Sequence, residues 1–420
     1  MAWRPYAAPD EREAILSAAT ELGDVLLWAS AADQPGATDA TLSRGEPGRA
    51  LALAYLDDAL PGRGYGDESS AALSRAVAAV AAQPLGPSLM QGFTGVAWAI
   101  AHLARRAGAD ASGATEAVDG ALSALLRDGR WTGPYDHVSG LVGIGVYALE
   151  RLPDPAGAEL LELVVTTLAD RAERADGAAT WFTAPAELHP DARGRAPDGY
   201  YNLGVAHGVP GVVSVLAGAT GAGVPGAAEW LDDAVTWLER QRLDDDAAAV
   251  WPFFVGPGVE SFASRLAWCY GDPGITLTLL QAAAARERED WVALADLAIE
   301  KMLSRAVGES GVTGASLCHG GAGLAHLCGR LHEASGRDGL DDMARTWARR
   351  TLGLRVDGEP MGGFTVWDPS DPQELGGDVQ GPGFLAGIAG VALTLAAAAT
   401  DVAPDWDRCL LVSLPESARP

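Results

Sequence analysis

The sequence has 420 residues, 48% of them hydrophobic and 20% charged, which is typical of a globular rather than a disordered protein. Thirty lysine and arginine residues stand against 56 aspartate and glutamate residues, and the resulting net charge of −26 argues against nucleic-acid binding, which needs a basic surface. Residues 1–20 lack the apolar core of an export signal, and the longest apolar run, residues 386–399, is shorter than the ~18 residues of a membrane span. We therefore expect a soluble, cytoplasmic protein without a membrane span.

One local pattern, Gly-x-x-Gly followed by an apolar run of helix length, recurs along the chain. It occurs seven times, and the first glycines stand 47 to 68 residues apart, at Gly45, Gly92, Gly140, Gly208, Gly271, Gly320 and Gly387. An interval of 47 residues fits two helices of about 15 residues with short connections. The run after each pair is apolar on nearly all sides, as in a buried inner helix, and the segments between carry more charge, as outer helices would.

These repeats predict an all-α fold, an α/α toroid with seven inner and seven outer helices. The glycines suit the crowded ends of the inner helices, where backbones approach closely. Two longer intervals contain irregular insertions near 176–202 and 356–384, which we interpret as short strands or loops. No linker divides the chain, so we expect residues 1–420 to form a single toroid domain.

Reactive side chains stand just before the first glycine in repeats four, five and six. His207 is one residue before its glycine, and Cys269 is two residues before its own. Cys318 and His319 are two residues and one residue before theirs. Equivalent repeat positions lie at one height around a toroid axis, so these side chains are expected to converge at one mouth.

Two thiolates and an imidazole suit zinc, which binds sulfur and nitrogen tetrahedrally. Three protein ligands leave one position open, as in catalytic zinc sites. We therefore predict that Cys269, Cys318 and His319 hold one Zn²⁺ per chain. A lone cysteine or histidine before a glycine turn is ordinarily structural. The other cysteines and histidines of the chain are expected to lie outside the zinc site. Core positions are expected for His102, His326, Cys328 and Cys409, and no repeat position connects the site with His137, His189 or His332.

Three segments together resemble the signature motifs of the lantibiotic cyclases, the LanC-like (lanthionine synthetase C) family: AHGVPG at 206–211, WCYGDPG at 268–274 and SLCHGGAG at 316–323. The glycine repeats extend the resemblance over roughly residues 40–400. The ending WDRCLLVSLP and the absence of a region of dehydratase length resemble the stand-alone, class I members. The resemblance implies an α/α toroid and a zinc ion held by two cysteines and one histidine, which match Cys269, Cys318 and His319.

The resemblance also implies a reaction and roles for further residues. The reaction is addition of a peptide cysteine thiol to dehydroalanine or dehydrobutyrine in a lantibiotic precursor, with zinc generating the thiolate. His207 is implied as an acid/base residue that protonates the α-carbon. Asp136, in PYDHVSGLVG, would orient His207 or accept the thiol proton, and Arg265, in SRLAWCYG, would stabilise the enolate oxygen or position a neighbouring group. Tyr270 is a further candidate; for Asp136 a loop-bracing role, and for Arg265 a salt bridge, remain open.

The implied partners are a dehydrated precursor peptide with a leader segment and a separate lantibiotic dehydratase. One alternative is a LanC-like enzyme that adds glutathione to dehydroamino acids in proteins, and another is a zinc-bearing scaffold that binds peptide without catalysis. Other α/α-toroid enzymes fit less well. Prenyltransferases bind zinc through Asp, Cys and His, and glycosidases need paired carboxylates, for which Asp136 has no obvious partner.

Overall fold

The computed structural model describes residues 3–29, 38–127, 129, 131–188, 194, 196–366 and 378–414. Most of these residues are helical, which confirms the predicted all-α class, and the strands are two or three residues long. The chain divides into two units. The first comprises Met1–Gly86, Met90–Ala111 and Gly311–Asp407, and the second comprises Pro87–Leu89, Ser112–Ser310 and Arg408–Pro420. The single-domain organisation stays a prediction.

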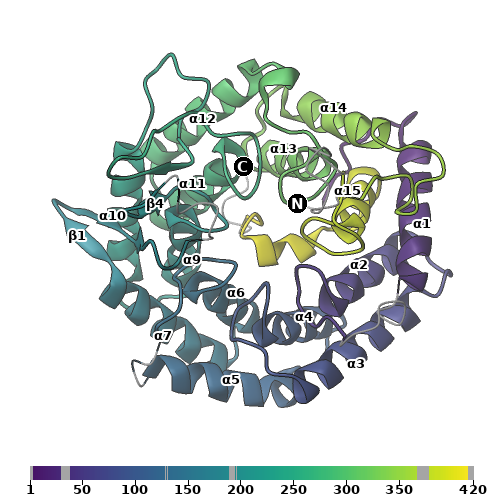
Figure 1. Ribbon diagram of the computed structural model, residues 1–420, viewed down its shortest axis with the longest axis horizontal. Coiled ribbons are helices and arrows are strands. Elements are labelled where there is room, and N and C mark those ends of the chain that lie inside the picture. The colour runs from purple at the N-terminus through teal and green to yellow at the C-terminus, as the bar shows by residue number, and fades with distance from the viewer. Residues whose placement is uncertain are drawn as a thin grey trace. The chain divides into compact units, whose positions relative to one another are not determined.

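The first unit packs apolar inner helices against more polar outer ones (Figure 1). Its inner helices are α2 (Glu46–Ala59), α4 (Phe93–Arg106), α13 (Gly321–Ser335) and α15 (Ile388–Ala399). Its outer helices are α1 (Arg12–Trp28), α3 (Tyr65–Ala82) and α14 (Leu340–Gly353). Every residue of α15 is buried, as expected for a helix without a polar face. Helix α1 was not predicted from the repeats, and it packs against α15.

The second unit has the same arrangement of inner and outer helices (Figure 1). Its inner helices are α6 (Leu141–Arg151), α9 (Val209–Gly221) and α11 (Asp272–Arg286). Its outer helices are α5 (Ser112–Arg127), α7 (Pro155–Arg171), α10 (Ala227–Arg240) and α12 (Glu289–Ser304). The described residues of the two units thus contain seven inner and seven outer helices, the numbers that the repeats predict, with α1, from before the first repeat, as the seventh outer helix.

The first glycine of each pair is the N-cap residue of an inner helix, as the repeat requires: Gly45, Gly92, Gly140, Gly208, Gly271, Gly320 and Gly387. These glycines have no side chain that could cap the helix. Carbonyl groups of the preceding loop accept hydrogen bonds from the first N–H groups of the helix instead. Gly321 N–H donates to Gly314 O at 2.8 Å, and Ile388 N–H donates to Gly381 O at 3.0 Å. The loop before each of these helices therefore folds back beneath the first turn and accepts its exposed N–H groups.

The second glycine of the pairs lies against the same loop. A Cβ on Gly323 would lie 1.8 Å from Leu317 O, and one on Gly274 would lie 2.6 Å from Trp268 O. Both oxygens belong to the residue six positions before the glycine. Because a backbone oxygen cannot approach a carbon so closely, only glycine allows the loop to pass under the helix.

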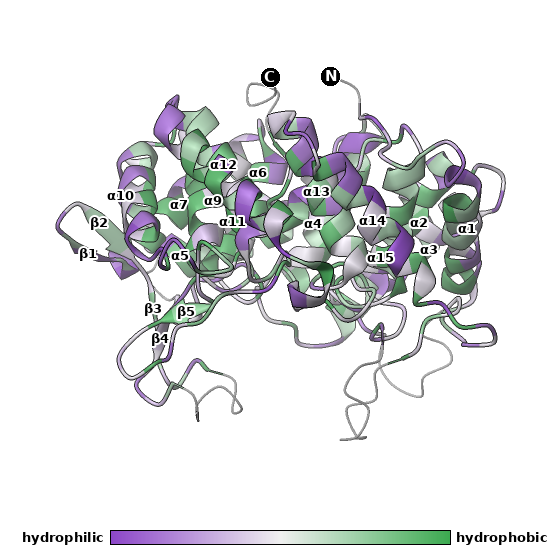
Figure 2. Ribbon diagram, turned by 90° about the horizontal axis from the view of Figure 1, so that it is seen from above, coloured by the Kyte–Doolittle hydropathy of each residue, from purple (hydrophilic) through white to green (hydrophobic). Residues whose placement is uncertain are grey.

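Two small antiparallel sheets belong to the second unit, and most of their strands fall in the region of the first predicted insertion. Strands β1 (Glu173–Ala175) and β2 (Ala178–Thr180) form a hairpin. Strands β3 (Phe182–Thr183), β4 (Tyr200–Asn202) and β5 (Phe254–Val255) form a sheet in the order β3-β4-β5. Figure 2 shows this second sheet below the helices of its unit. In the region of the second predicted insertion, near 356–384, residues 367–377 lie outside the described part, and the rest contains isolated β-bridges, such as Met361 with Phe364.

None of the helices in the described part is both long enough and apolar enough to cross a membrane. The longest apolar run of the sequence, residues 386–399, contains α15, a helix of 12 residues that ends at Ala399.

Replacement of Gly323 by alanine is expected to lower the free energy of unfolding by about 2–4 kcal/mol, because its Cβ would meet a backbone oxygen. Gly120, an exposed residue of α5, provides the control, since a Cβ there meets nothing within 4 Å. Gly120→Ala should raise stability by up to about 1 kcal/mol through helix propensity. Urea unfolding of both variants measures the difference, and equal stabilities would contradict the steric explanation.

Candidate functional site

Three adjacent loops of the second unit, those before α6, α9 and α11, carry most of the predicted reactive residues. Backbone hydrogen bonds join each loop to the next. Val138 N–H donates to Ala206 O at 3.3 Å, and Ala206 N–H donates to Cys269 O at 3.4 Å. The loops that carry Asp136, His207 and Cys269 are therefore held side by side by their backbones.

Asp136 and His207 form a hydrogen-bonded pair. His207 Nδ1 lies 2.7 Å from Asp136 Oδ2, and the other carboxylate oxygen accepts the Ser139 N–H at 2.6 Å. A carboxylate beside Nδ1 makes that nitrogen the donor, which leaves Nε2 to exchange a proton with a ligand. The aspartate thus braces its own loop and also orients the imidazole.

The surroundings of His207 raise its pKa above the ordinary value of histidine. Burial among protein atoms is the largest effect and opposes protonation. The hydrogen bond to Asp136, the charge of Asp136 and the charge of Cys269 favour the imidazolium and outweigh burial. The side chain nevertheless keeps 41% of its surface accessible, so a ligand can reach it.

Arg265 lies beside the sulfur of Cys269 on the same loop. Its Nη2 atom is 3.5 Å from Cys269 Sγ, which places a positive charge where a thiolate would be stabilised. Its Nε atom is buried and has no hydrogen-bond partner within the described residues. The Nε–H group is thus a buried donor that no acceptor among the described residues satisfies.

Tyr270 is held by a residue that the sequence did not reveal, Asn202. Asn202 Nδ2 donates to Tyr270 Oη at 2.9 Å, and its Oδ1 atom accepts the Gly204 N–H at 2.8 Å. A Cβ on Gly204 would lie 2.7 Å from the Tyr270 ring, so the glycine allows this close packing. Burial, the largest effect, raises the pKa of Tyr270, which keeps the phenol protonated at neutral pH.

A cavity of about 440 Å³ opens between these loops and strands β3 and β4. The loops and strands contribute both predicted and unpredicted residues to its wall, among them Asp136, Ser139, Thr183, Tyr200, Asn202, His207 and Tyr270. Its volume lies in the range of small-molecule and side-chain binding sites. The Asp136–His207 pair therefore faces a space that can hold a substrate group.

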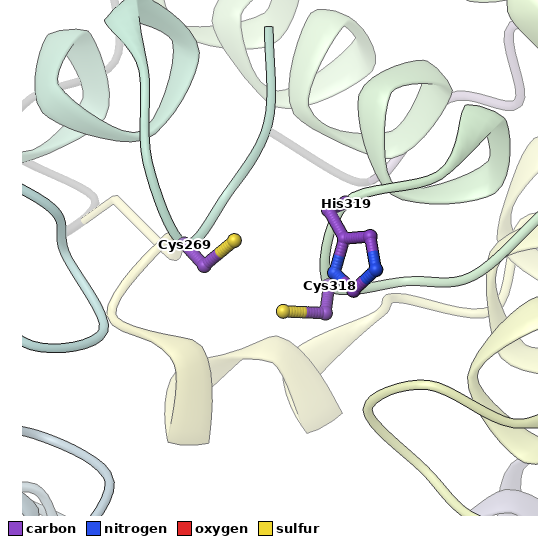
Figure 3. Close-up of side chains that lie close together, drawn as sticks. All are labelled: Cys269, Cys318 and His319. Carbon is purple, nitrogen blue, oxygen red and sulfur yellow. The ribbon is translucent and has the colours of Figure 1, made fainter. Parts of the chain in front are cut away.

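The three predicted metal ligands form a group. A sulfur atom each from Cys269 and Cys318 and a ring nitrogen of His319 all lie within 4.8 Å of one another (Figure 3). Cys318 and His319 are partly exposed and Cys269 is buried. The group could bind a metal ion, and none of the four cysteines forms a disulfide.

The segment 409–413 is anchored by buried side chains from around the site. His137 Nε2 lies 2.6 Å from Cys409 O, and Trp268 Nε1 donates to Leu410 O at 2.8 Å. Gln281 Nε2 donates to Leu411 O at 2.9 Å. Burial, the largest effect, lowers the pKa of His137 to about 4, so this histidine is neutral and serves as a structural donor. His137 and Trp268 immediately neighbour Asp136 and Cys269, and their anchoring steadies both loops.

The other histidines and cysteines are located as follows. His102, His326, Cys328 and Cys409 are buried core residues. His332 is half-buried in α13 and contacts Arg337 O, whereas His189 lies outside the described residues.

Tyr200 and Asn202 were missed because they end an irregular insertion. A signal existed, since Asn202 stands six residues before its N-cap glycine, Gly208, as Arg265 does before Gly271. The residues predicted from the repeats stand one or two positions before their glycines, whereas Asn202 lies farther from its own.

Comparisons with known proteins place the chain in one family. Residues 36–411 match the lanthionine synthetase C-like proteins. Among curated proteins, the nisin biosynthesis protein NisC of Lactococcus lactis subsp. lactis is 27% identical over 272 residues, which cover 62% of this chain and 60% of that protein. The solved structure of nisin cyclase is similar with a TM-score of 0.73 and 22% identity, over 96% of this chain and 97% of that chain. This structural likeness shows the fold and confirms the predicted α/α toroid.

Replacement of Asp136 by asparagine is expected to lower the pKa of His207, because the favourable charge disappears while burial of the imidazole remains. Titration of the histidine C–H resonances by NMR measures the change, with His207→Gln identifying the signal. The exposed ion-pair residue Asp290 supplies the control, and Asp290→Asn should leave the titration in place. An unchanged His207 titration in Asp136→Asn would contradict the pairing.

Proposed function

Because the chain belongs to the lanthionine synthetase C-like family, we propose that it is a zinc-dependent cyclase of lantibiotic precursors. It adds cysteine thiols of a dehydrated peptide to dehydroalanine or dehydrobutyrine and so closes lanthionine and methyllanthionine rings. The observation that carries the proposal is the group of two sulfurs and an imidazole formed by Cys269, Cys318 and His319. We further propose that the enzyme works in the cytoplasm on a leader-bearing precursor supplied by a separate dehydratase.

The ligand group fits zinc in both chemistry and spacing. Two sulfurs at about 2.3 Å from a tetrahedral ion lie about 3.8 Å apart, which the 4.8 Å limit within the group accommodates. Three ligands leave a fourth position for a substrate. When bound, zinc supplies the Lewis acidity that keeps a substrate thiol deprotonated at neutral pH.

The chain's own residues complete the addition. As the sulfur–carbon bond forms at the β-carbon, the alkene π pair moves to the α-carbon and carbonyl as an enolate. Protonated His207, with its pKa raised and its Nδ1 atom held by Asp136, donates the Nε2 proton to the α-carbon. The guanidinium of Arg265, whose Nη2 atom lies 3.5 Å from Cys269 Sγ, supplies positive charge that stabilises the developing negative charge. The thiol proton lost at the start balances the proton that is delivered.

Two alternatives make different predictions for the same site. A glutathione-adding enzyme would consume glutathione and leave the free thiols of a dehydrated precursor unchanged. A peptide-binding scaffold would hold zinc but form no rings, so loss of His207 would change nothing. The raised pKa of His207 and its accessible side chain favour an active enzyme over a scaffold.

Metal removal is expected to stop ring formation. Elemental analysis should find one zinc per chain. Ring formation is measured by alkylating the free thiols of a dehydrated precursor and counting the added groups by mass spectrometry. After dialysis against a chelator, the protein should contain no zinc and the precursor should keep all of its free thiols. Cys318→Ala should lose the metal, whereas Cys328→Ala, at a buried cysteine of α13, should keep it. Full zinc content in Cys318→Ala would exclude the proposed ligand set.

Replacement of His207 by glutamine is expected to slow cyclisation by roughly 10²–10⁴-fold, the usual effect of losing a general acid or base. Zinc content should stay at the wild-type value, because His207 is not part of the ligand group. His332→Gln removes a half-buried histidine elsewhere and should cyclise at the normal rate. A wild-type rate in His207→Gln would exclude His207 as the general acid, whereas absence of ring formation in the wild type and the variant alike would favour the scaffold.

A further inference from the structure

Aromatic side chains are concentrated around the β3-β4-β5 sheet. Of the seven phenylalanines in the chain, four lie in or beside it: Phe182, Phe253, Phe254 and Phe262. Ring contacts continue from these residues to the tyrosines of the cavity. We use the name aromatic band for Tyr200, Phe253, Phe254, Phe262 and Tyr270.

The rings of the band form a continuous row of contacts. Phe262 lies 5.4 Å from Phe253, and Phe253 lies 5.5 Å from Tyr270, measured between ring centroids. Phe254 stacks on Tyr200 at 5.1 Å. These separations are typical of interacting aromatic rings.

The band connects the protein surface with the acid/base pair. Its outer end is Phe262, which is 52% exposed. Phe253 and Phe254 are half-buried, and the inner end is formed by Tyr200 and Tyr270, which line the cavity together with His207. The row therefore runs from solvent to the residue proposed to donate the proton.

Packing within the sheet does not account for the exposed end of the band. A ring that served only to stabilise two-residue strands would be buried, whereas half of Phe262 faces water. A row of aromatic rings that begins at the surface and ends in the wall of a cavity is typical of a binding site. The chain's net charge of −26 disfavours a second copy of itself as the occupant, since two such molecules repel.

The dimensions of the band suit an extended peptide. Side chains on one face of an extended chain recur about every 6.6 Å, so successive side chains of such a peptide would meet successive rings of a row that runs from Phe262 through Phe253 to Tyr270. We infer that the aromatic band binds apolar side chains of the substrate peptide, in extended form, next to the dehydroamino acid that enters the cavity. The inference rests on the proposed function for the identity of the peptide.

Binding of synthetic peptides tests this inference without requiring catalysis. The probe is a fluorescent ten-residue peptide with one dehydroalanine, serine in place of cysteine, and leucine or phenylalanine at alternate positions on one side. A second peptide carries serine at those positions. Anisotropy titrations use the full zinc-loaded chain, Phe262→Ser, Phe262→Trp and, as the matched control, Trp28→Ser, which removes another exposed aromatic ring, 79% exposed, at the end of α1.

Phe262→Ser is expected to weaken binding of the apolar peptide about three- to tenfold, the loss of one aromatic contact. Phe262→Trp and Trp28→Ser should bind it as the wild type does, and the serine peptide should bind more weakly to every protein. Wild-type affinity in Phe262→Ser would overturn the inference, as would equal binding of the two peptides. A change from dimer to monomer in Phe262→Ser, seen by light scattering, would assign the band to self-association and also overturn it.

Failure of the proposed function gives a different result. If the wild type binds the apolar peptide through Phe262 but closes no ring in a dehydrated precursor, the band is a peptide site and the cyclase proposal fails. If rings close at the wild-type KM and kcat in Phe262→Ser, the cyclase proposal stands and the inference about the band fails.

Discussion

The constraint on which the structure depends is the close approach of a loop carbonyl to the second glycine of six repeats, at Gly48, Gly143, Gly211, Gly274, Gly323 and Gly390. At Gly323 the space for a Cβ is already occupied by Leu317 O, and at Gly390 it is occupied by Phe384 O. The folded-back loop that results replaces side-chain caps, since its carbonyls accept the first N–H groups of the helix. A rigid, short loop at the start of a buried helix is therefore the common unit of the fold.

These loops are also where the chemistry is located. A loop that caps a helix with its backbone leaves its side chains available for other contacts. In the third, fourth and fifth repeats, which belong to the second unit, these loops carry Asp136, His207 and Cys269. Backbone bonds between neighbouring loops then fix the spacing of those side chains. Preorganisation of this kind, by backbone contacts rather than flexible side chains, is what acid/base and metal chemistry require.

Much of this could be predicted because steric constraints leave a signature in sequence. Seven glycine pairs indicated seven inner helices, and the shared offset of Cys269 and Cys318 before their glycines indicated the ligand group. Asp136 and Arg265 came only from the family resemblance, because they stand at different offsets in their loops. The link between Asn202 and Tyr270 could not be predicted, since it depends on pairing of β4 with β5, two very short strands far apart in the chain. Helix α1 precedes the first repeat, so the spacing of the repeats could not predict it.

The anchoring of segment 409–413 affects the order in which the loops of the site can reach their final structure while the chain is synthesised. His137 and its acceptor, Cys409 O, are separated by 272 residues. At a synthesis rate of about 5–20 residues per second, the acceptor is made on the order of tens of seconds after the histidine. Until then the buried donors of His137 and Trp268 lack these carbonyls, and the neighbouring Asp136 and Cys269 lack their final support. A nascent chain therefore acquires its finished loops only after residues 409–413 have been synthesised and have bound these donors.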